Sequence, residues 1–435
     1  MNKSQIALWA LYDFAITILE LNVALYFSEW LVIDNGVSEL VYGSAIAVSI
    51  LIALLILPVL GLLSDRDQRR LPYLYFFTFL GAATVILIGA FGLNIDRSPA
   101  LVVISLLLFV IMNISYQGSL VFYNSILSSI APKKSMGFVS GIGIAAGYVG
   151  AIIGGWIVSM FVNDSIPFLN ISMPFIDNSS RIHAFIPSAL LFLLFAAPAL
   201  LFLQEPRLRE PLKSRLQRMK AHVQQAPSYY QAVLEDIRRF GQYPSALRFL
   251  IAFFFFNNAI GTVMIFAPLY MENVFHLADV QKLPIMISAL FAAAFGGLAG
   301  GWYADRRGNQ RALSHVLVAW MVVLGIILFV SDSRVFGIVF AVGGIFFGAT
   351  WAISRAYFIT LIPETEQGKF FSFYSIFERF ALIIGPIVWG SAVVLFAGFG
   401  TVKYQIALSS MIVLIVIGFV LLRRLHAPEM LTKTS

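Results

Sequence analysis

Long apolar runs separated by short polar segments follow one another along the whole chain. Twelve such runs lie near residues 6–30, 39–63, 71–93, 100–125, 137–162, 184–204, 246–271, 283–304, 312–331, 334–358, 370–397 and 403–424. Each approaches or exceeds the ~20 residues that a helix needs to cross a bilayer. The strands of a membrane barrel are about ten residues long and alternate polar with apolar positions, which these runs do not. The pattern predicts an all-α membrane protein with twelve transmembrane helices.

The amino-acid composition excludes several classes of function. Hydrophobic residues make up 60% of the chain and charged residues 12%, whereas charged residues are roughly a quarter of a soluble domain. The net charge of +7 is spread over loops, so we expect no nucleic-acid partner. The chain has no cysteine, and its 5 histidines are scattered without a His-Glu-x-x-His motif. We therefore expect no metal, no cofactor and no enzymatic activity.

Basic residues predict the orientation in the membrane. Lys and Arg are concentrated in loops on the side of the N-terminus, and the opposite loops hold few, among them Arg181 and Lys282. The positive-inside rule then places both termini in the cytoplasm, and we expect a multi-pass protein of the inner (plasma) membrane of the cell. Three Asn-x-Ser sequons, which would matter only in a secretory pathway, are interpreted as chance occurrences: Asn163, Asn170 and Asn178.

The apolar pattern divides the chain in two. Residues 205–245 are rich in Arg and Lys, and their apolar positions recur at helical spacing, which predicts an amphipathic cytoplasmic linker. We expect a six-helix bundle at 1–204 and a second at 246–435, which ends in a short cytoplasmic tail.

Short motifs recur in both halves. A charged segment after the second apolar run, Gly61 to Arg70, resembles another after the eighth run, Gly301 to Gln310. Asp13-x-x-x-Thr17 in the first run likewise parallels Asn258-x-x-x-Thr262 in the seventh. Duplicated membrane bundles are most often transporters.

The Gly-x-x-x-Asp-Arg-x-x-Arg-Arg segment, Gly61 to Arg70, resembles the signature loop of the major facilitator superfamily. Three narrower stretches resemble the vacuolar, autophagy-linked amino-acid effluxer family and its bacterial relatives. They are Trp9 to Ala15, Phe122 to Ser125 with Gly143 to Gly150 downstream, and Ser354-Arg355 with Glu378-Arg379 and Gly385-Pro386. The superfamily resemblance implies that spans one, four, seven and ten line a central cavity. In the yeast-type members of the effluxer family the implied activity is release of amino acids from a compartment, whereas for the bacterial relatives the resemblance implies no particular substrate. Asn258, Glu378 and Glu20 depart from the family's pattern, so coupling ion and substrate can differ.

Polar residues inside the spans are the candidate site. A charge near the middle of the bilayer costs roughly 2.5–3.5 kcal/mol, so each should face a partner or a wet cavity. Arg355 or Arg379 could hold a carboxylate, and Glu20 or Asp13 could accept an ammonium group or a proton. Alternatively these residues form permanent structural ion pairs, such as Glu378 or Glu20 with Arg355. The expected substrate or proton site comprises Asp13, Thr17, Glu20, Asn113, Gln117, Asn124, Asn258, Arg355, Glu378 and Arg379.

The duplicated charged segments are interpreted as a cytoplasmic gate. In the superfamily pattern the carboxylate of this loop lies against a neighbouring helix N-terminus, where the helix dipole favours it. The resemblance implies this role for Gly61, Asp65, Arg66, Arg70, Gly301, Asp305 and Arg306.

The sequence predicts a secondary transporter that exports a small polar solute, with amino acids and protons as candidate cargo and coupling ion. Residues 1–204 would rock against 246–424, with the solute bound near the midplane, and we expect a monomer in the lipid bilayer. An exporter of lipids or hydrophobic drugs is the alternative, because the chain has 40 phenylalanines. A non-transporting membrane sensor is a further interpretation.

Overall fold

The computed structural model describes residues 3–67, 70–94, 98–130, 136–166, 171–172, 179–204, 243–362, 374 and 377–425. Within them, 12 helical segments are long and apolar enough to cross a membrane. The prediction of an all-α protein with twelve spans is confirmed. Nearly all of the expected linker, 205–242, lies outside the described residues, as do Asn170 and Asn178.

Packing divides the chain into two compact units. Unit 1 comprises Met1–Val37 and Val48–Val233, and unit 2 comprises Ser38–Ala47 and Leu234–Ser435. The helix α2 (Glu39–Asp67) therefore begins in unit 2 and continues in unit 1. The sequence division at the linker does not show this exchange, because it follows chain order and not contacts.

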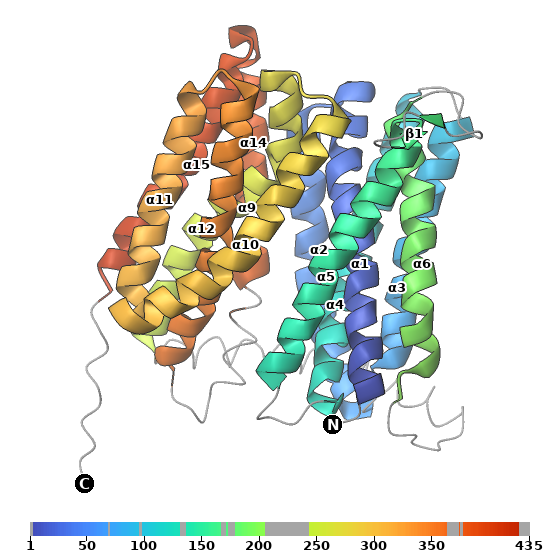
Figure 1. Cartoon of the computed structure of the whole chain (residues 1–435), viewed down its shortest axis with the longest axis horizontal. Coiled ribbons are helices and arrows are strands. Elements are labelled where there is room, and N and C mark those ends of the chain that lie inside the picture. The colour runs from blue at the N-terminus through green and yellow to red at the C-terminus, as the bar shows by residue number, and fades with distance from the viewer. Residues whose placement is uncertain are drawn as a thin grey trace. The chain divides into compact units, whose positions relative to one another are not determined.

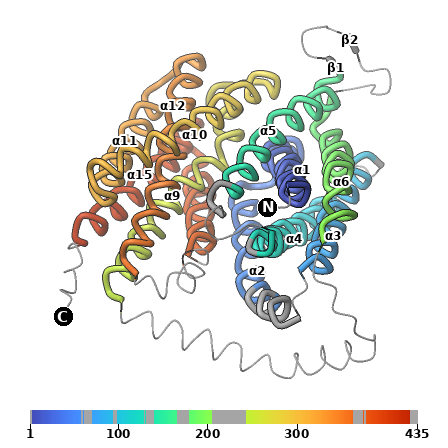
Figure 2. Tube along the Cα trace, turned by 60° about the horizontal axis from the view of Figure 1, so that its bottom comes forward, coloured from blue at the N-terminus to red at the C-terminus, as the bar shows by residue number. Residues whose placement is uncertain are grey.

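Unit 1 is a bundle built around its first helix (Figures 1 and 2). The π-helical turn η1 extends α1, and the short strands β1 and β2 pair between α5 and α6, with Ser165 opposite Ser172. The remaining elements are the following: α1 (Lys3–Glu29), η1 (Trp30–Asp34), α3 (Leu71–Asn94), α4 (Pro99–Ile130), α5 (Met136–Val162), β1 (Ser165–Ile166), β2 (Ile171–Ser172), the 3-10 turn η3 (Arg181–Ala184) and α6 (Phe185–Phe202).

Unit 2 contains the remaining helices. Its eleventh span, Phe377–Leu395, is interrupted by a turn before α14 begins. The elements are α9 (Pro244–Phe275), α10 (Asp279–Arg307), α11 (Asn309–Phe329), α12 (Ser333–Thr360), α14 (Ile384–Leu395), the 3-10 turn η4 (Ala397–Phe399) and α15 (Val402–Arg423).

Local sequence explains where the helices of unit 2 begin and end. Pro244 occupies the first turn of α9, where its missing N–H costs nothing. His276 ends that helix in a left-handed conformation, φ 52°. Gly308, with φ 84°, separates α10 from α11. Asp332 caps α12, since its carboxylate accepts the N–H groups of Arg334 and Val335 at 2.7 and 3.2 Å.

The first helix of each unit is the most buried one. In α1 and η1, 56% of the most apolar window is buried, and in α9 67%, against at most 44% in the other spans. The helix α1 packs against α5 and α6, and α9 against α15 and α14. Side chains on these two helices therefore face protein on most sides, so a polar group there must find protein partners or water.

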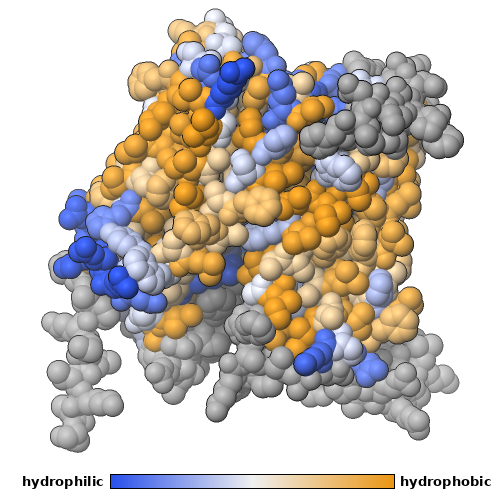
Figure 3. Space-filling view, in the orientation of Figure 1, coloured by the Kyte–Doolittle hydropathy of each residue, from blue (hydrophilic) through white to orange (hydrophobic). Residues whose placement is uncertain are grey.

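Apolar side chains cover the sides of the helices in each unit, and hydrophilic ones gather near the helix ends (Figure 3). Phe291, Leu298 and Phe329, for instance, are 63%, 79% and 87% exposed. A soluble protein would not leave so many large apolar side chains uncovered. This surface suits a bilayer.

Two basic residues that the sequence analysis counted among the loops instead lie in helical segments as parts of ion clusters. In unit 1, Arg181 of η3 pairs with Glu29 at 3.3 Å and with Asp34 at 2.8 Å. All three side chains come from segments at the same end of the bundle, where η1 ends and α6 is about to begin.

The second cluster lies in unit 2. Lys282 of α10 is fully buried and pairs with Glu272 and with Asp279, the latter at 2.9 Å. Opposite charges at such burial compensate each other's lost hydration. Arg181 and Lys282 therefore stabilise the folded structure, in addition to their contribution to the orientation in the membrane.

Candidate functional site

In unit 1, an aromatic stack positions one tyrosine of α4. The Tyr123 ring lies parallel to Trp9, with ring centroids 4.4 Å apart, and 5.6 Å from the ring of Tyr12. The Trp9 indole N–H also donates to the Tyr123 carbonyl at 2.9 Å, and the Tyr12 hydroxyl bonds to Thr78 at 2.6 Å. Two stacked rings and one hydrogen bond from the Trp9 indole therefore fix the position of Tyr123.

This stack aims the Tyr123 hydroxyl at Asp13. The two groups interact, yet the hydroxyl is buried without a hydrogen-bonding partner at normal distance. Two glycines of α5 permit the approach. A Cβ on Gly143 would lie 2.7 Å from the Tyr123 hydroxyl, and one on Gly147 would lie 2.9 Å from Thr17 Oγ1 and 3.5 Å from Asp13 Cγ. The motifs quoted from α1, α4 and α5 thus converge on one carboxylate.

Glu20 lies on the same face of α1 as Asp13 and Thr17, and its side chain is exposed. Its carboxylate accepts a hydrogen bond from Tyr116 of α4. Thr17 donates to the Asp13 carbonyl at 2.7 Å. The structure therefore brings α1 and α4 together, with a tyrosine of α4 beside each carboxylate.

The three amides expected on α4 are placed differently from one another. Asn113 donates to the Phe109 carbonyl of its own helix at 3.3 Å, a local bond that uses one of its donors. Gln117 is half-buried, and Asn124 is exposed. The contacts to the carboxylates come instead from phenolic side chains of α4, Tyr116 and Tyr123.

In unit 2, Asn258 of α9 is a packing residue. Its amide N–H₂ donates to the Phe254 carbonyl at 3.1 Å, and its oxygen accepts the Gly385 backbone N–H at 2.8 Å. Gly385 lies in the first turn of α14, where a backbone N–H has no partner within its own helix. The amide thus anchors the interrupted helix to α9.

Unit 2 also joins an arginine to a glutamate. A guanidinium nitrogen of Arg355 lies 3.7 Å from a carboxylate oxygen of Glu378, with 46% of the Arg355 side chain and 20% of the Glu378 side chain exposed. Arg355 also lies over the Trp351 ring at 5.7 Å and interacts with Tyr374. Arg379 adds a second positive charge near Glu378. Of the structural ion pairs that the sequence analysis named as an alternative, the pair of Glu378 with Arg355 is therefore present, with its charged atoms far apart for an ion pair.

Sequence reasoning missed a buried carboxylate, Glu39. It is 2% exposed and accepts the Trp389 indole N–H at 2.7 Å. Lys403 and the Tyr404 hydroxyl also interact with it. A Cβ on Gly390 would lie 2.5 Å from the Leu40 backbone, so α2 and α14 meet closely here. The only signal in the sequence is an acidic residue that opens an apolar run, and an acidic residue is ordinary in the first turn of a helix.

Within either unit, the described residues bring no three carboxylate or histidine ligand atoms within 4.8 Å of one another. We assign no metal site to this part of the chain.

Comparison with known proteins gives the family. The sequence profile described as Major Facilitator Superfamily matches residues 9–332 and 285–435. The chain belongs to this superfamily. It is accordingly a membrane transporter of small molecules and not an enzyme.

Similar proteins agree with this assignment. The uncharacterized MFS-type transporter YxiO of Bacillus subtilis (strain 168) is 26% identical over 425 residues, which covers 95% of this chain and 93% of that protein. Autophagy-related protein 22 of Candida glabrata is 25% identical over 156 residues, covering 33% of this chain and 28% of that protein. The crystal structure of the nucleoside transporter NupG has a TM-score of 0.71 at 14% identity and covers 97% of this chain and 99% of that one. That structural likeness concerns the fold alone.

The segment that carries the superfamily signature is described in part. Gly61, Asp65 and Arg66 lie in the last turns of α2, but their side chains are outside the described set. Arg70 precedes α3, and its carbonyl accepts the Leu74 N–H at 3.0 Å. The gate role of this copy stays a prediction.

The second copy ends α10. Arg306 stacks on Trp302 at 3.9 Å, and Asp305 is exposed without a hydrogen bond or ion pair to any described side chain. A Cβ on Gly301 would meet nothing within 4 Å. This copy therefore has an accessible carboxylate, and its role as a gate also stays a prediction.

Proposed function

We propose that this superfamily member is a secondary active transporter of a small zwitterionic solute, with amino acids as the candidate class and export as the direction. It would work by alternating access, exposing its substrate site to the two sides of the membrane in turn. The support is chemical: unit 1 has carboxylates beside tyrosines, and unit 2, considered by itself, has an exposed arginine.

Asp13 with Tyr123 is the observation that carries the proposal. A half-buried carboxylate inside a span is costly unless it has a function or a partner, and its neighbour Tyr123 has a buried hydroxyl without a partner at normal distance. An ammonium group of a solute would satisfy both, because it donates up to three hydrogen bonds. Such an arrangement favours a polar cargo over a hydrophobic one.

Arg355 supports recognition of a carboxylate. At 3.7 Å its contact with Glu378 is too long for a normal hydrogen bond, and the guanidinium has five N–H donors in a planar fork. With 46% of its side chain exposed, the arginine can offer two parallel donors to a solute carboxylate. Glu378 would then hold the arginine in place while no solute is bound.

Three phenylalanines of α9, part of the set that suggested a lipid or drug exporter, are buried inside unit 2. In the run on α9, Phe253 and Phe256 are 1% and 0% exposed, and Phe249 is 0% exposed. The Phe253 ring packs 4.7 Å from that of Tyr374. These rings fill the core of unit 2, so they give that alternative no support.

Glu20 and Asp13 are the groups we propose for proton coupling, because both carboxylates lie within the first span and each interacts with a tyrosine of α4. We further propose a monomer in the plasma membrane with both termini in the cytoplasm. The concentration of Lys and Arg on one side of the spans supports the orientation.

Transport into proteoliposomes tests the proposal. The purified chain is reconstituted, a panel of amino acids is offered with and without a proton gradient, and uptake is counted. We expect at least one amino acid to be transported faster than in empty vesicles. Arg355→Ala should reduce that uptake by about ten- to a hundredfold, the loss of a charge-assisted hydrogen bond.

Arg424→Ala is the matched control, because Arg424 is exposed after the end of α15 and should leave uptake unchanged. Undiminished uptake in Arg355→Ala and in Arg379→Ala would remove the carboxylate clamp. Transport of only apolar solutes would overturn the proposed substrate class.

A further inference from the structure

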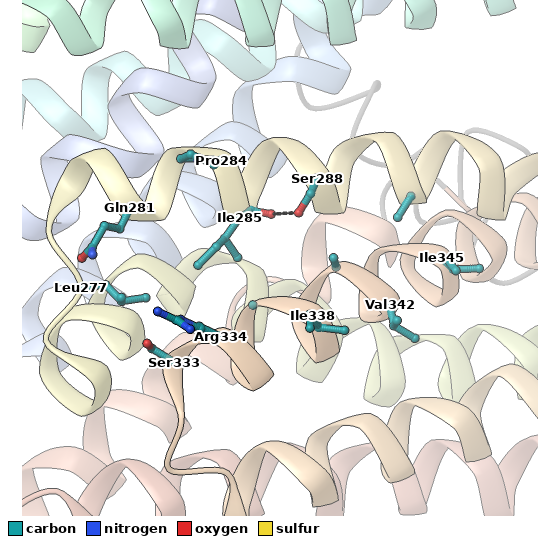
Figure 4. Close-up of a pocket in the computed structure, with 13 residues that line it drawn as sticks. Leu277, Gln281, Pro284, Ile285, Ser288, Ser333, Arg334, Ile338, Val342 and Ile345 are labelled. Atoms are coloured by element: carbon teal, nitrogen blue, oxygen red, sulfur yellow. Dashed lines mark hydrogen bonds between the residues drawn. The ribbon is translucent and has the colours of Figure 1, made fainter. Parts of the chain in front are cut away.

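The outer face of unit 2 carries an open groove of about 700 Å³ between α10 and α12. It contains none of the candidate transport residues. Its walls are Gln281 to Ala292 on α10 and Ser333 to Ile345 on α12, together with Leu277 before α10. Figure 4 shows side chains from both helices facing each other along it.

One end of the groove is polar and basic. Arg334, Ser333 and Gln281 come together where α10 and α12 begin (Figure 4). Arg334 is exposed, and its guanidinium forms no ion pair with a described residue. One carboxylate oxygen of nearby Asp332, Oδ1, accepts the first N–H groups of α12. An anion would therefore meet a positive charge and the donors of two further side chains here.

The remainder of the groove is apolar, and its length is informative. From Arg334 to Ile345 the helix advances 11 residues, or about 16 Å at 1.5 Å per residue. One leaflet of a bilayer has a hydrocarbon depth of ~15 Å, half of the ~30 Å core. The groove thus reaches from the headgroup level to about the middle of the membrane.

The groove opens to the lipid side. Ile338 and Val342 on α12 are 67% and 41% exposed, and Val280 near the start of α10 is 53% exposed. Its floor is formed by close helix packing, since a Cβ on Gly337 would lie 3.4 Å from Ile285. Deeper along the pair, glycines of α12 approach the backbone of α10. The two helices are in contact at the floor of the groove and leave an open channel above it.

We propose that this groove binds one phospholipid of the leaflet that faces the beginnings of α10 and α12. The phosphate lies on Arg334, with Ser333 and Gln281 as further donors, and one acyl chain runs along α12 from Ile338 to Ile345. Basic pockets between membrane helices bind phospholipid headgroups by the same attraction. The length of the groove, the exposed Arg334 at its polar end and the apolar floor fit this occupant together.

Native mass spectrometry of the whole chain in detergent tests the proposal. The probes are a phosphatidylglycerol and the diacylglycerol with the same acyl chains, titrated separately. We expect one phosphatidylglycerol to remain bound at low lipid concentration and diacylglycerol to bind about tenfold more weakly, because it lacks the charged phosphate. Arg334→Ala should weaken phosphatidylglycerol binding by a similar factor, whereas Arg248→Ala, an exposed arginine near the start of α9, should not.

A second pair of variants tests the acyl-chain part. Ala292→Phe should fill the groove and abolish the retained lipid, whereas Ala294→Phe changes an exposed position of the same helix outside the groove and should leave it bound. Equal retention in Arg334→Ala, Ala292→Phe and the unchanged chain would overturn the proposal and show ordinary annular lipid. Equal binding of diacylglycerol would overturn the assignment of Arg334 to the phosphate.

Discussion

The packing of α1 against α5 in unit 1 and of α9 against α14 in unit 2 uses corresponding positions for different purposes. In both, a polar residue and a threonine one turn later face a glycine of the partner helix: Asp13, Thr17 and Gly147 in unit 1, and Asn258, Thr262 and Gly385 in unit 2. Asp13 keeps its carboxylate half-buried beside Tyr123. Asn258 instead uses its amide for two backbone bonds.

The comparison indicates that corresponding positions of the two units have different roles, one structural and one functional. An amide can satisfy a donor and an acceptor at once and needs no counterion, so it suits a buried anchor. A carboxylate is costly at the same depth and is retained where a cation or a proton can reach it. We infer that α1 of unit 1 supplies the carboxylate that binds a cation or a proton, whereas α9 of unit 2 holds the interrupted α14 in place.

The largest loss of stability should follow from replacing Asn258 of unit 2 with aspartate, the residue at the corresponding position of unit 1. Asn258→Asp places a carboxylate oxygen against the Phe254 carbonyl at a position 1% exposed. We expect the free energy of unfolding to fall by about 3 kcal/mol or more, the cost of an uncompensated buried charge. Unfolding of the purified variant in detergent measures this. Unchanged stability would contradict the view of Asn258 as an anchor.

The reverse exchange should spare stability and remove transport. Asp13→Asn keeps the size of the side chain but loses its charge, so we expect uptake to fall by about ten- to a hundredfold. Unfolding in detergent should shift by less than about 1 kcal/mol, because the lost charge was costly at this depth. Proteoliposome uptake and thermal unfolding are measured side by side. Full uptake in this variant would sink the assignment of Asp13 to the substrate or proton.

The glycines should differ in how much they tolerate a methyl group. A Cβ on Gly385 would lie 2.0 Å from the Thr262 hydroxyl and 2.6 Å from the backbone carbonyl oxygen of Asn258, whereas the nearest atom to a Cβ on Gly147 would be the Thr17 hydroxyl at 2.9 Å, a side-chain atom. Gly385→Ala should therefore cost about 1–3 kcal/mol of unfolding free energy through overpacking, and Gly147→Ala less than that. Thermal unfolding of the two variants compares them. An equal loss would show that the two helix contacts are equally tight.

The smallest expected change in unfolding free energy is the difference between valine substitutions of Thr17 and Thr262. Thr17 donates to the Asp13 carbonyl at 2.7 Å, so Thr17→Val should cost about 0.5–1.5 kcal/mol. The Thr262 hydroxyl is buried without a hydrogen-bonding partner, so Thr262→Val should be neutral or slightly stabilising. The two unfolding curves are compared under one detergent condition. A larger loss in Thr262→Val would show that this hydroxyl has a function that the structure does not reveal.

Some parts of the site were predictable because they depend on local spacing. Asp13, Thr17 and Glu20 share a face of α1 because residues three and four apart are neighbours on a helix. Their depth inside an apolar run marked them as costly and hence as candidates. The partners were not predictable in this way. Nothing in the spacing says that Tyr116 and Tyr123, rather than the amides of α4, would reach the carboxylates.

By itself the sequence determined the class, the number of spans and the duplication, since a bilayer requires about twenty apolar residues for each crossing and every backbone group must be paired within its own helix. Only the tertiary structure decided that Asn258 anchors Gly385, that Glu39 is buried against Trp389, and that α10 and α12 leave a lipid-sized groove. Those outcomes depend on distances between residues far apart in the chain. Such distances are set by how closely helices approach, and local pattern does not encode that.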